Sequence, residues 1–378
     1  MREYLLVFLV ATAVTYLLTV LAREIALRLG AVAGVRDRDV HAEPVPYLGG
    51  VAMYGGMVAA FLVARELPFL SRSYDFVFSD AAHVLIAGAV ICAVGVVDDI
   101  IELDALSKLG GQVIAAGILV WFGIQYNFFY LPDGRVISEN SQAAALSVFA
   151  VLATANAVNF VDGLDGLAAG VVGVGATAFF VFCYQIANLN QLPLATTGAL
   201  LSAMLAGACA GFLVHNFHPA RIFMGDSGSM LLGLMLTASA MTLTAQFNPA
   251  DLEREAATGQ TWLIFLLPVM VSIAILVVPL SDLTLSIIRR TSQLKPFFHP
   301  DKQHLHHRLL ELGHSHRRAV LVMWSWAALF GFGTVLAVLY GGRTILITLG
   351  LMLLLTLAAT FLLPRIRGTS RAPSEHTG

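Results

Sequence analysis

Long apolar runs separated by short polar stretches fill most of this sequence and limit the folds open to it. Eleven runs are long enough to cross a bilayer as a helix, for which about 20 apolar residues suffice. They lie at 4–27, 47–64, 81–97, 109–126, 143–160, 166–187, 194–214, 227–246, 262–288, 319–340 and 343–363. Because 58% of the residues are hydrophobic and only 12% are charged, no aqueous globule could bury this apolar surface. We therefore predict an all-α, polytopic integral membrane protein with about eleven transmembrane helices.

The distribution of Lys and Arg predicts the orientation of these helices. With the N-terminus outside, sixteen of the 22 basic residues fall in inner loops and six in outer loops. Short cytoplasmic loops carry such an excess, so we predict an outside N-terminus, a cytoplasmic C-terminus and a location in the cell membrane. Residues 1–367 are expected to form a single transmembrane domain, followed by a disordered cytoplasmic tail at 368–378.

Most of the unusual polar residues fall in four of the predicted inner loops. The first, "GVVDDIIELDALSKLGGQ", carries the adjacent acids Asp98 and Asp99 and the lone cation Lys108. The others are "NAVNFVDGLDG", "HNFHPARIFMGDSGS" and "FFHPDKQHLHHRLLELGHSH". Two abutting carboxylates beside an apolar run repel each other unless a cation neutralises them. We expect the four loops to meet on one face and to form a functional site.

Each loop also has a structural interpretation. The glycines of "NFVDGLDG" permit a tight turn, and "FMGDSGS" could be an N-cap box in which Asp226 or Ser227 caps the next helix. The histidines of the fourth loop could bind zinc, although no Cys accompanies them, or could belong to a solvated basic loop. Acids combined with His and Arg, which suit phosphate, instead favour magnesium chemistry on a phosphorylated substrate.

Five motifs, in this order along the chain, resemble those of the polyprenyl-phosphate N-acetylhexosamine-1-phosphate transferases, the family that includes WecA, TagO and MraY. The similarity begins at "HAEPVPYLGG", continues through the four loops and covers residues 41–313. It implies a catalytic transmembrane domain that transfers a sugar 1-phosphate from a UDP-sugar to a membrane polyprenyl phosphate and releases UMP. The resemblance also implies Mg²⁺ as cofactor, with Mn²⁺ as a substitute, and an active site on the cytoplasmic face, in agreement with the charge distribution.

The family pattern further implies roles for individual residues of this chain. Asp98 and Asp99 would be the catalytic acids, and Asp226 would be the principal magnesium ligand, with Asn159 as a second ligand or support. A larger set would bind the substrates. Its members are Lys108, Asn156, Asp162, Asp165, Asn216, Phe223, His41, His304, His306, His307 and Arg308. Within this set Phe223 would stack on uracil, and Lys108 and the loop histidines would meet the phosphates.

The motifs also indicate a branch of the family. "QHLHHR" and "RIFMGDSGSMLLG" are more similar to the WecA and TagO branch than to the MraY branch, whose members use UDP-MurNAc-pentapeptide. We therefore expect UDP-GlcNAc as donor, undecaprenyl or decaprenyl phosphate as acceptor and a role in the first membrane step of cell-envelope glycan assembly. UDP-MurNAc-pentapeptide is the alternative donor. Asp39 in "RDRDVH" departs from the family, where a basic residue is common, and leaves the roles of Arg38 and His41 open.

Two other classes of protein share some of these features. An ion-coupled secondary transporter also uses intramembrane acids and glycine-broken helices, but its site should lie near the middle of the bilayer, where only Asp282 is placed. We expect Asp282 to have a structural role or to support the residues of the site from behind. A lipid-binding scaffold would explain the basic loop but not the paired carboxylates. A homodimer is compatible with the sequence, and a nucleic-acid partner is not expected.

Overall fold

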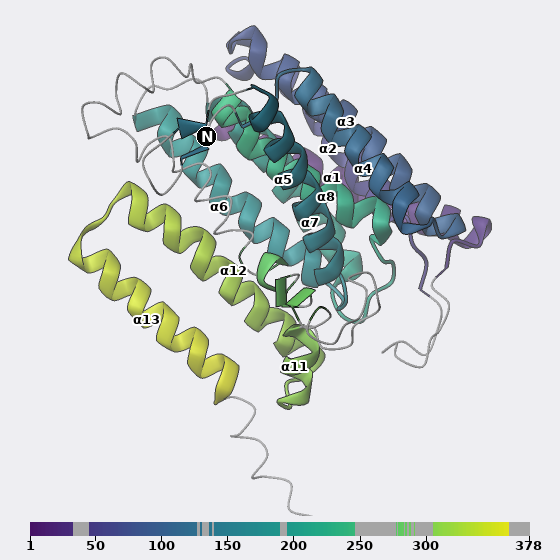
Figure 1. The fold of residues 1–378 in the computed structure, drawn as a ribbon, viewed down its shortest axis with the longest axis vertical. Helices are drawn as coiled ribbons and strands as arrows, with labels where there is room; N and C mark the ends of the chain where they lie inside the picture. Colours follow the sequence, from purple (N-terminus) through teal and green to yellow (C-terminus); the bar gives the residue numbers. More distant parts are fainter. Residues whose placement is uncertain are drawn as a thin grey trace, which may run out of the picture.

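The computed structural model describes residues 1–32, 45–126, 129–130, 136–137, 140–189, 195–245, 277, 279–282, 284–285, 287–288, 291 and 305–362. Figure 1 labels its helices, which are α1 (Arg2–Leu29), α2 (Gly49–Glu66), α3 (Asp75–Ile101), α4 (Ala105–Trp121), α5 (Asn140–Val161), α6 (Leu167–Leu189), α7 (Ala195–Asn216), α8 (Gly225–Ala245), α11 (Leu305–Glu311), α12 (His316–Leu339) and α13 (Gly342–Phe361). A short 3-10 helix, η1 (Leu70–Arg72), precedes α3. Between α4 and α5 two short strands, β1 (Phe129–Tyr130) and β2 (Val136–Ile137), pair antiparallel.

The helices agree with the apolar segments predicted from the sequence. Ten of the eleven segments coincide with a described helix, and 262–288 falls mostly outside the described residues. Eight of the described helices are long and apolar enough to cross a membrane, namely α1, α3, α5, α6, α7, α8, α12 and α13. The 17-residue α4 is apolar but shorter. The prediction of a helical, polytopic membrane protein is therefore confirmed, with the small β-ribbon as an addition.

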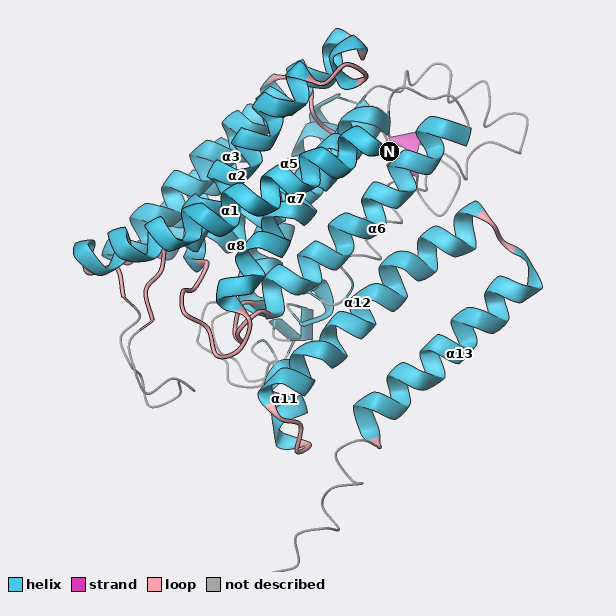
Figure 2. Cartoon of the chain, turned by 180° about the vertical axis from the view of Figure 1, so that it is seen from behind, coloured by secondary structure: helices cyan, strands magenta, loops and turns pink. Residues whose placement is uncertain are grey.

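Helix α8 lies at the centre of the bundle. It packs against α2, α3, α5, α6 and α7. Of its most apolar 18-residue stretch, 94% is buried inside the protein. Small residues permit this close packing, since a Cβ atom on Gly233 would come within 2.6 Å of the Ala155 Cα atom on α5. In contrast, only 11% of the corresponding apolar stretch of α13 is buried. Figures 1 and 2 show α12 and α13 as a hairpin along one side of the bundle.

At one end of the bundle, several described loops are joined by polar contacts. The backbone N–H of Gly49, at the start of α2, donates to the Phe223 carbonyl oxygen in the loop before α8 (3.1 Å). Near the end of α1, Arg23 Nε donates to the Arg221 carbonyl oxygen of the same loop (3.2 Å). The contacts described below join this loop to the turns after α3 and α5 and to the start of α12. The prediction that four inner loops meet on one face is confirmed for their described parts.

At the opposite end of the bundle, the start of α1 contacts the turn after α2. Glu3, in the first turn of α1, accepts hydrogen bonds from the backbone N–H groups of Phe69 (2.7 Å) and Leu70 (2.8 Å). These bonds fix the turn after α2 to the start of the chain. The polar residues that carry chemistry are therefore separated from this end by the length of the helices.

Candidate active site

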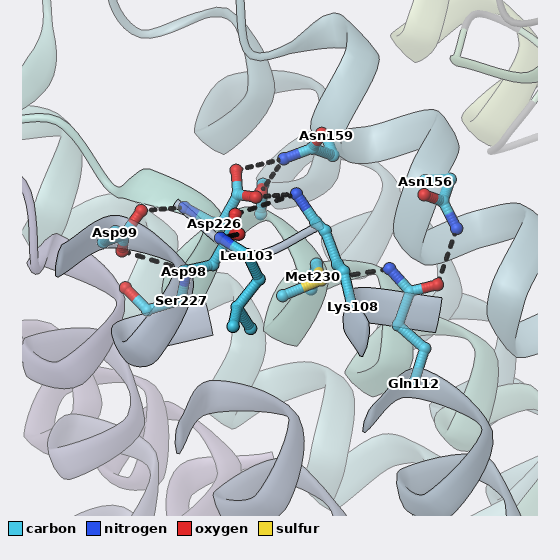
Figure 3. A network of polar contacts seen from close by, with 11 residues as sticks. Asp98, Asp99, Leu103, Lys108, Gln112, Asn156, Asn159, Asp226, Ser227 and Met230 are labelled. Atoms are coloured by element: carbon cyan, nitrogen blue, oxygen red, sulfur yellow. Dashed lines mark hydrogen bonds and ion pairs between the residues drawn. The ribbon is translucent and has the colours of Figure 1, made fainter. Parts of the chain in front are cut away.

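Lys108 brings two acids together where α3 ends and α4 begins. Its Nζ atom lies 3.2 Å from Asp98 Oδ2 and also forms an ion pair with Asp226 Oδ2. Helix α4 starts one turn earlier, where Asp104 accepts a hydrogen bond from the Ser107 N–H (2.7 Å) as N-cap. The side chains of the three paired residues are between 14% and 21% exposed, so water screens their attraction less than on an open surface. Figure 3 shows Lys108 reaching from α4 toward Asp226.

The adjacent acids Asp98 and Asp99 have different partners. Asp98 Oδ1 accepts from the Leu103 N–H (2.8 Å), while its Oδ2 faces Lys108. The two oxygens of Asp99 accept from the backbone N–H groups of Asp226 (2.7 Å) and Ser227 (3.2 Å) at the start of α8. A helix leaves its first amides without intrahelical acceptors, and here Asp99 supplies them. The capping oxygens thus come from α3, and the N-cap interpretation based on Asp226 or Ser227 is wrong.

Gly225 allows Asp99 to approach the start of α8. Its φ of 69° lies in the left-handed region, which side chains with a Cβ atom adopt rarely. A Cβ atom at this position would also collide with the Asp99 carboxylate. Gly225, the first glycine of the "MGDSG" motif, is therefore required by the contact between α3 and α8.

Asn159 approaches Asp226 from α5, on the side opposite Asp99 in Figure 3. Its Nδ2 donates to Asp226 Oδ1 (2.6 Å) and to Ser229 Oγ (2.9 Å). The two ends of an Asn amide are assigned from their hydrogen bonds, so a rotated amide would present its oxygen to the same position. The Asp226 carboxylate is therefore held between the ammonium of Lys108 and the amide of Asn159.

Asn156 lies one turn before Asn159 on α5 and belongs to a buried amide pair. Its Nδ2 donates to Gln112 Oε1 on α4 (2.7 Å) and to the Leu152 carbonyl oxygen (2.8 Å). Gln112 is 1% exposed and donates in turn to Met230 Sδ on α8 (3.1 Å). This chain of contacts joins α4, α5 and α8 beside Lys108 (Figure 3). It places Asn156 in a structural contact next to the predicted substrate site.

Asp162 and Asp165 lie in the turn between α5 and α6 but have different surroundings. Asp162 keeps some accessible surface. Burial of its carboxyl group and, after that, the charges of Asp99 and Asp165 raise the pKa of Asp162 to about 7. Asp165 is buried, and its Oδ2 accepts from His218 Nδ1 (2.7 Å). Asp165 therefore already has a hydrogen-bond partner within the protein.

Asn216 and Phe223 flank the loop between α7 and α8. Asn216 is 2% exposed, and its amide accepts from the Gly166 N–H (2.9 Å) and donates to the Ile222 carbonyl oxygen (3.0 Å). It therefore shapes the loop. The half-buried ring of Phe223 lies 6.1 Å from the Tyr47 ring, centroid to centroid, and one ring face is tilted by 43° against the other. Tyr47 extends the aromatic surface predicted for a base.

The remaining predicted residues lie in or near the fourth inner loop. His41 and His304 fall outside the described residues, as do the side chains of His306 and His307, although both positions belong to α11. Arg308 is exposed and lines, with apolar residues of α11, α12 and α13, a cavity of about 750 Å³. Asp282 is buried, and its Oδ1 accepts from the Leu305 N–H (2.9 Å) at the start of α11. This contact agrees with a structural role for Asp282, which stays a prediction.

The donor atoms around Asp226 fit a hard divalent cation. Asp226 and Asp98 supply carboxylate oxygens, and Asn159 can supply an amide oxygen, which are the ligand types that Mg²⁺ prefers. Lys108 neutralises both acids from between them, so a cation would compete with the ammonium group for Asp226. Phosphate oxygens that arrive with the cation would give Lys108 a new anionic partner.

Several residues of the site were not predicted from the sequence. Gln112 and Ser229 complete the contacts of Asn156 and Asn159. A glutamine inside an apolar run was a signal for a buried polar contact. His218 and His316 both stand in loops quoted above, yet only the structure brings both to Asp165.

The chain is similar to known proteins over most of its length. Residues 81–244 match the glycosyl transferase family 4. Over 373 residues the chain is 42% identical to a decaprenyl-phosphate N-acetylglucosaminephosphotransferase of Mycobacterium tuberculosis (strain ATCC 25618 / H37Rv), which covers 97% of this chain and 90% of that relative. It is 30% identical over 339 residues to a probable undecaprenyl-phosphate N-acetylglucosaminyl 1-phosphate transferase of Bacillus subtilis (strain 168), covering 89% and 85%. A phospho-N-acetylmuramoyl-pentapeptide-transferase of Desulforudis audaxviator (strain MP104C) is 31% identical over 359 residues, covering 88% and 96%.

Proposed function

The chain belongs to glycosyl transferase family 4, and on that premise we propose that it transfers N-acetylglucosamine 1-phosphate from UDP-GlcNAc to a membrane polyprenyl phosphate. An oxygen of the lipid phosphate attacks the phosphorus atom that carries the sugar. The bond from that phosphorus to the oxygen bridging it to UMP breaks, and UMP leaves with the electron pair. The products are a polyprenyl diphosphate-linked sugar and UMP.

The observation that carries this proposal is the position of Lys108 between Asp98 and Asp226. Transfer between two phosphates brings negative groups together and moves charge to the leaving group, so catalysis depends on positioning and neutralisation. A partly buried ammonium group held by two acids supplies a fixed positive charge at the ends of α3, α4 and α8. Asp226 and Asn159 would hold Mg²⁺, or Mn²⁺ in its place, and the bound cation would supply further neutralisation of phosphate oxygens.

Asp98 has the position of a residue that orients the acceptor. A phosphate monoester has a second pKa of about 6, so the lipid phosphate is largely dianionic at neutral pH and needs no strong base. Asp98 is already bound to Lys108 and to the Leu103 amide, which fixes its orientation. We assign to it the orientation of the acceptor phosphate, through Lys108, and the relay of a proton from the remaining monoanion.

The donor is expected to bind beside the loop between α7 and α8. Phe223, with Tyr47 next to it, offers an aromatic surface for uracil, and Asp162 lies in the neighbouring turn. The printed names of the Mycobacterium tuberculosis and Bacillus subtilis relatives support N-acetylglucosamine as the sugar. UDP-MurNAc-pentapeptide, suggested by the name of the Desulforudis audaxviator relative, is the alternative donor.

We also place the site on the cytoplasmic face of the cell membrane, in a protein with eleven crossings. The end of the bundle that holds Lys108 also holds Arg23, Arg221 and Arg317, in line with the basic excess of inner loops. Among the described residues, the interacting acids around Lys108 lie at helix ends. This position supports a transferase, which meets a soluble nucleotide sugar, over a transporter with a site at the bilayer midplane.

A reconstitution assay tests the proposal. Purified protein in nanodiscs is given decaprenyl phosphate, Mg²⁺ and either UDP-GlcNAc or UDP-MurNAc-pentapeptide, and UMP is measured. We expect UMP from UDP-GlcNAc only, and only when both the lipid phosphate and the divalent cation are present. Lys108→Met keeps much of the length of the side chain, removes its charge and should abolish turnover. No UMP from either donor in the parent protein would contradict the proposal.

A further inference from the structure

One buried carboxylate fixes the loop between α7 and α8 to the turn between α5 and α6. Asp165, in that turn, is 4% exposed. Its Oδ2 accepts from His218 Nδ1 (2.7 Å) and from the Ala220 N–H (3.0 Å). Both donors belong to the loop that ends at Met224, directly before α8, whose second residue is Asp226. Movement of Asp165 would therefore be transmitted to the segment that presents Asp226.

The start of α12 holds the same turn and the same loop. His316 Nε2 accepts from the Asp165 N–H (3.1 Å), which requires that a neutral His316 carries its proton on Nδ1. The His316 ring stacks on the His218 ring, with centroids 4.2 Å apart and planes inclined by 17°. Arg317 Nε donates to the His218 carbonyl oxygen (3.0 Å). The first two residues of α12 thus contact both segments.

Apolar packing brings α11 to the same turn. Leu164 and Leu167, on either side of Asp165, belong to one apolar cluster with Leu309 of α11 and Ala319 of α12. Helix α11 carries part of the histidine motif, and the loop between α7 and α8 leads to Asp226. The turn at Asp165 therefore joins the two segments that are expected to face the substrate phosphates from different sides.

A metal site is the competing explanation for these three side chains. One ligand atom each of Asp165, His218 and His316 lies within 4.8 Å of the others. However, a backbone N–H always donates, so the Nε2 lone pair of His316 is used by the Asp165 amide. Asp165 Oδ2 already accepts two hydrogen bonds. A metal ion would take these acceptors from buried amides, and the geometry therefore favours hydrogen bonding.

We propose that Asp165, His218 and His316 form a positioning cluster, which keeps α11 and the loop before Asp226 in register for the transfer reaction. In this role the cluster does not contact the substrate, whereas the family resemblance implied that Asp165 binds it. The inference rests on the proposed function, because phosphoryl transfer is sensitive to register: a misplacement of about 1 Å can cost about a hundredfold in rate.

Two variants of His316 distinguish the loss of its hydrogen-bond acceptor from the loss of its ring. His316→Leu removes the acceptor, whereas His316→Gln places an amide oxygen near the former Nε2 position and restores it. His218→Leu is a second disrupting variant from the other side of the stack. His314→Leu is the matched control, because this buried histidine lies two residues before His316 but contacts the Thr360 carbonyl oxygen on α13 (2.9 Å).

The first measurement needs no activity. Hydrogen exchange of residues 217–226 is followed in the purified full chain. We expect exchange at least about threefold faster in His316→Leu and His218→Leu, because local opening becomes easier. His316→Gln and His314→Leu should exchange like the parent. Parent-like exchange in both disrupting variants would overturn the cluster, whatever the activity of the protein.

The second measurement separates positioning from substrate contact. In His316→Leu we expect kcat to fall about tenfold or more, with the KM for UDP-GlcNAc changed less than about threefold, and recovery in His316→Gln. A rise of about tenfold in the KM for UDP-GlcNAc, with kcat retained, would overturn the proposal in favour of direct contact with the substrate. Stoichiometric Zn²⁺ binding by the parent, lost in both Leu variants, would overturn it in favour of a metal site. A parent that forms no UMP refutes the proposed function, while the exchange result still decides the cluster.

Discussion

Asp99 Oδ1 accepts the backbone N–H of Asp226 at 2.7 Å, across the contact between α3 and α8. The second acid of the adjacent pair therefore holds the helix that presents Asp226, whereas Asp98 faces Lys108. Two acids that are neighbours in the sequence thus have separate tasks. The first belongs to the charged centre of the site, and the second fixes the position of that centre.

Asp99→Ala should reduce stability more than Asp98→Ala. It leaves the backbone amides of Asp226 and Ser227 without their acceptor. Each buried donor left without an acceptor lowers the free energy of unfolding by about 1–3 kcal/mol. We expect a clearly lower apparent melting temperature and loss of UMP release for Asp99→Ala. Asp98→Ala should lose activity with a smaller thermal effect. Equal melting temperatures of Asp99→Ala and the parent would show that the cap is not needed.

Gly225→Ala should damage the same contact from the side of α8. The substitution places a Cβ atom at positive φ and against the Asp99 carboxylate, so melting temperature and activity should both fall. Gly110→Ala on α4 is the matched control, since its new Cβ meets nothing within 4 Å. Helix propensity predicts that this control gains about 0.5–1 kcal/mol of stability. Thermal unfolding in detergent and UMP release measure both effects.

Asp226→Asn should abolish turnover while the protein folds and inserts. The variant keeps the shape of the side chain but removes the charge expected to hold Mg²⁺, and a loss of several kcal/mol of transition-state stabilisation lowers the rate by at least about a hundredfold. A magnesium titration of UMP release should not restore the parent rate. Asp75→Asn, at the opposite end of α3, is the control and should retain full activity. Near-normal turnover of Asp226→Asn at ordinary magnesium would remove Asp226 from the ligand set.

The proposed single displacement makes a prediction about isotope exchange. If the lipid phosphate attacks the donor directly, no enzyme-bound sugar phosphate exists, and radiolabelled UMP should not enter UDP-GlcNAc when the lipid is rigorously absent. Asp98→Asn should slow the reaction yet leave activity that rises with pH, because the lipid monoanion ionises around its second pKa of about 6. Exchange without lipid in the parent, abolished by Asp98→Asn, would indicate a covalent intermediate on Asp98.

Single-cysteine labelling tests the membrane topology. Ala105→Cys and Leu312→Cys lie at the end of the bundle that holds Lys108, and Ser71→Cys lies at the opposite end, all at exposed positions. Impermeant thiol reagents should reach the first two only from the cytoplasmic side and the third only from outside. The native residues Cys92, Cys183 and Cys209 are buried, so background labelling of their thiols should be low. Labelling with the opposite sidedness would reverse the proposed orientation.

The helices and the face that carries the site could be predicted from local patterns. Apolar length identified ten described helices, and the excess of Lys and Arg placed the four loops together. The apolar length is a property of each single segment, and the excess of Lys and Arg is a sum over the loops. The motif residues Asp98, Lys108, Asn159 and Asp226 are in direct contact through Lys108 and Asp226, as a shared site requires.

Contacts between distant segments could not be predicted in the same way. The division of tasks between Asp98 and Asp99 depends on the rotation of the end of α3 and on the absence of a side chain at Gly225. The link from Asp165 to His316 joins residues 151 positions apart. A sequence motif shows which polar residues are present, but packing decides whether each faces a ligand or another part of the protein.

The burial of α8 also has a consequence for how the protein is made. Its sequence is the least apolar among the eight membrane-spanning candidates, and its surface is almost wholly covered by other helices. A segment this weakly apolar has little tendency to leave the translocon for lipid on its own. Helices α3, α5 and α7 precede it in the chain and form the surface that receives it. Substitutions that loosen those three helices should therefore appear first as failed integration of α8 during synthesis, before any folded protein can be assayed.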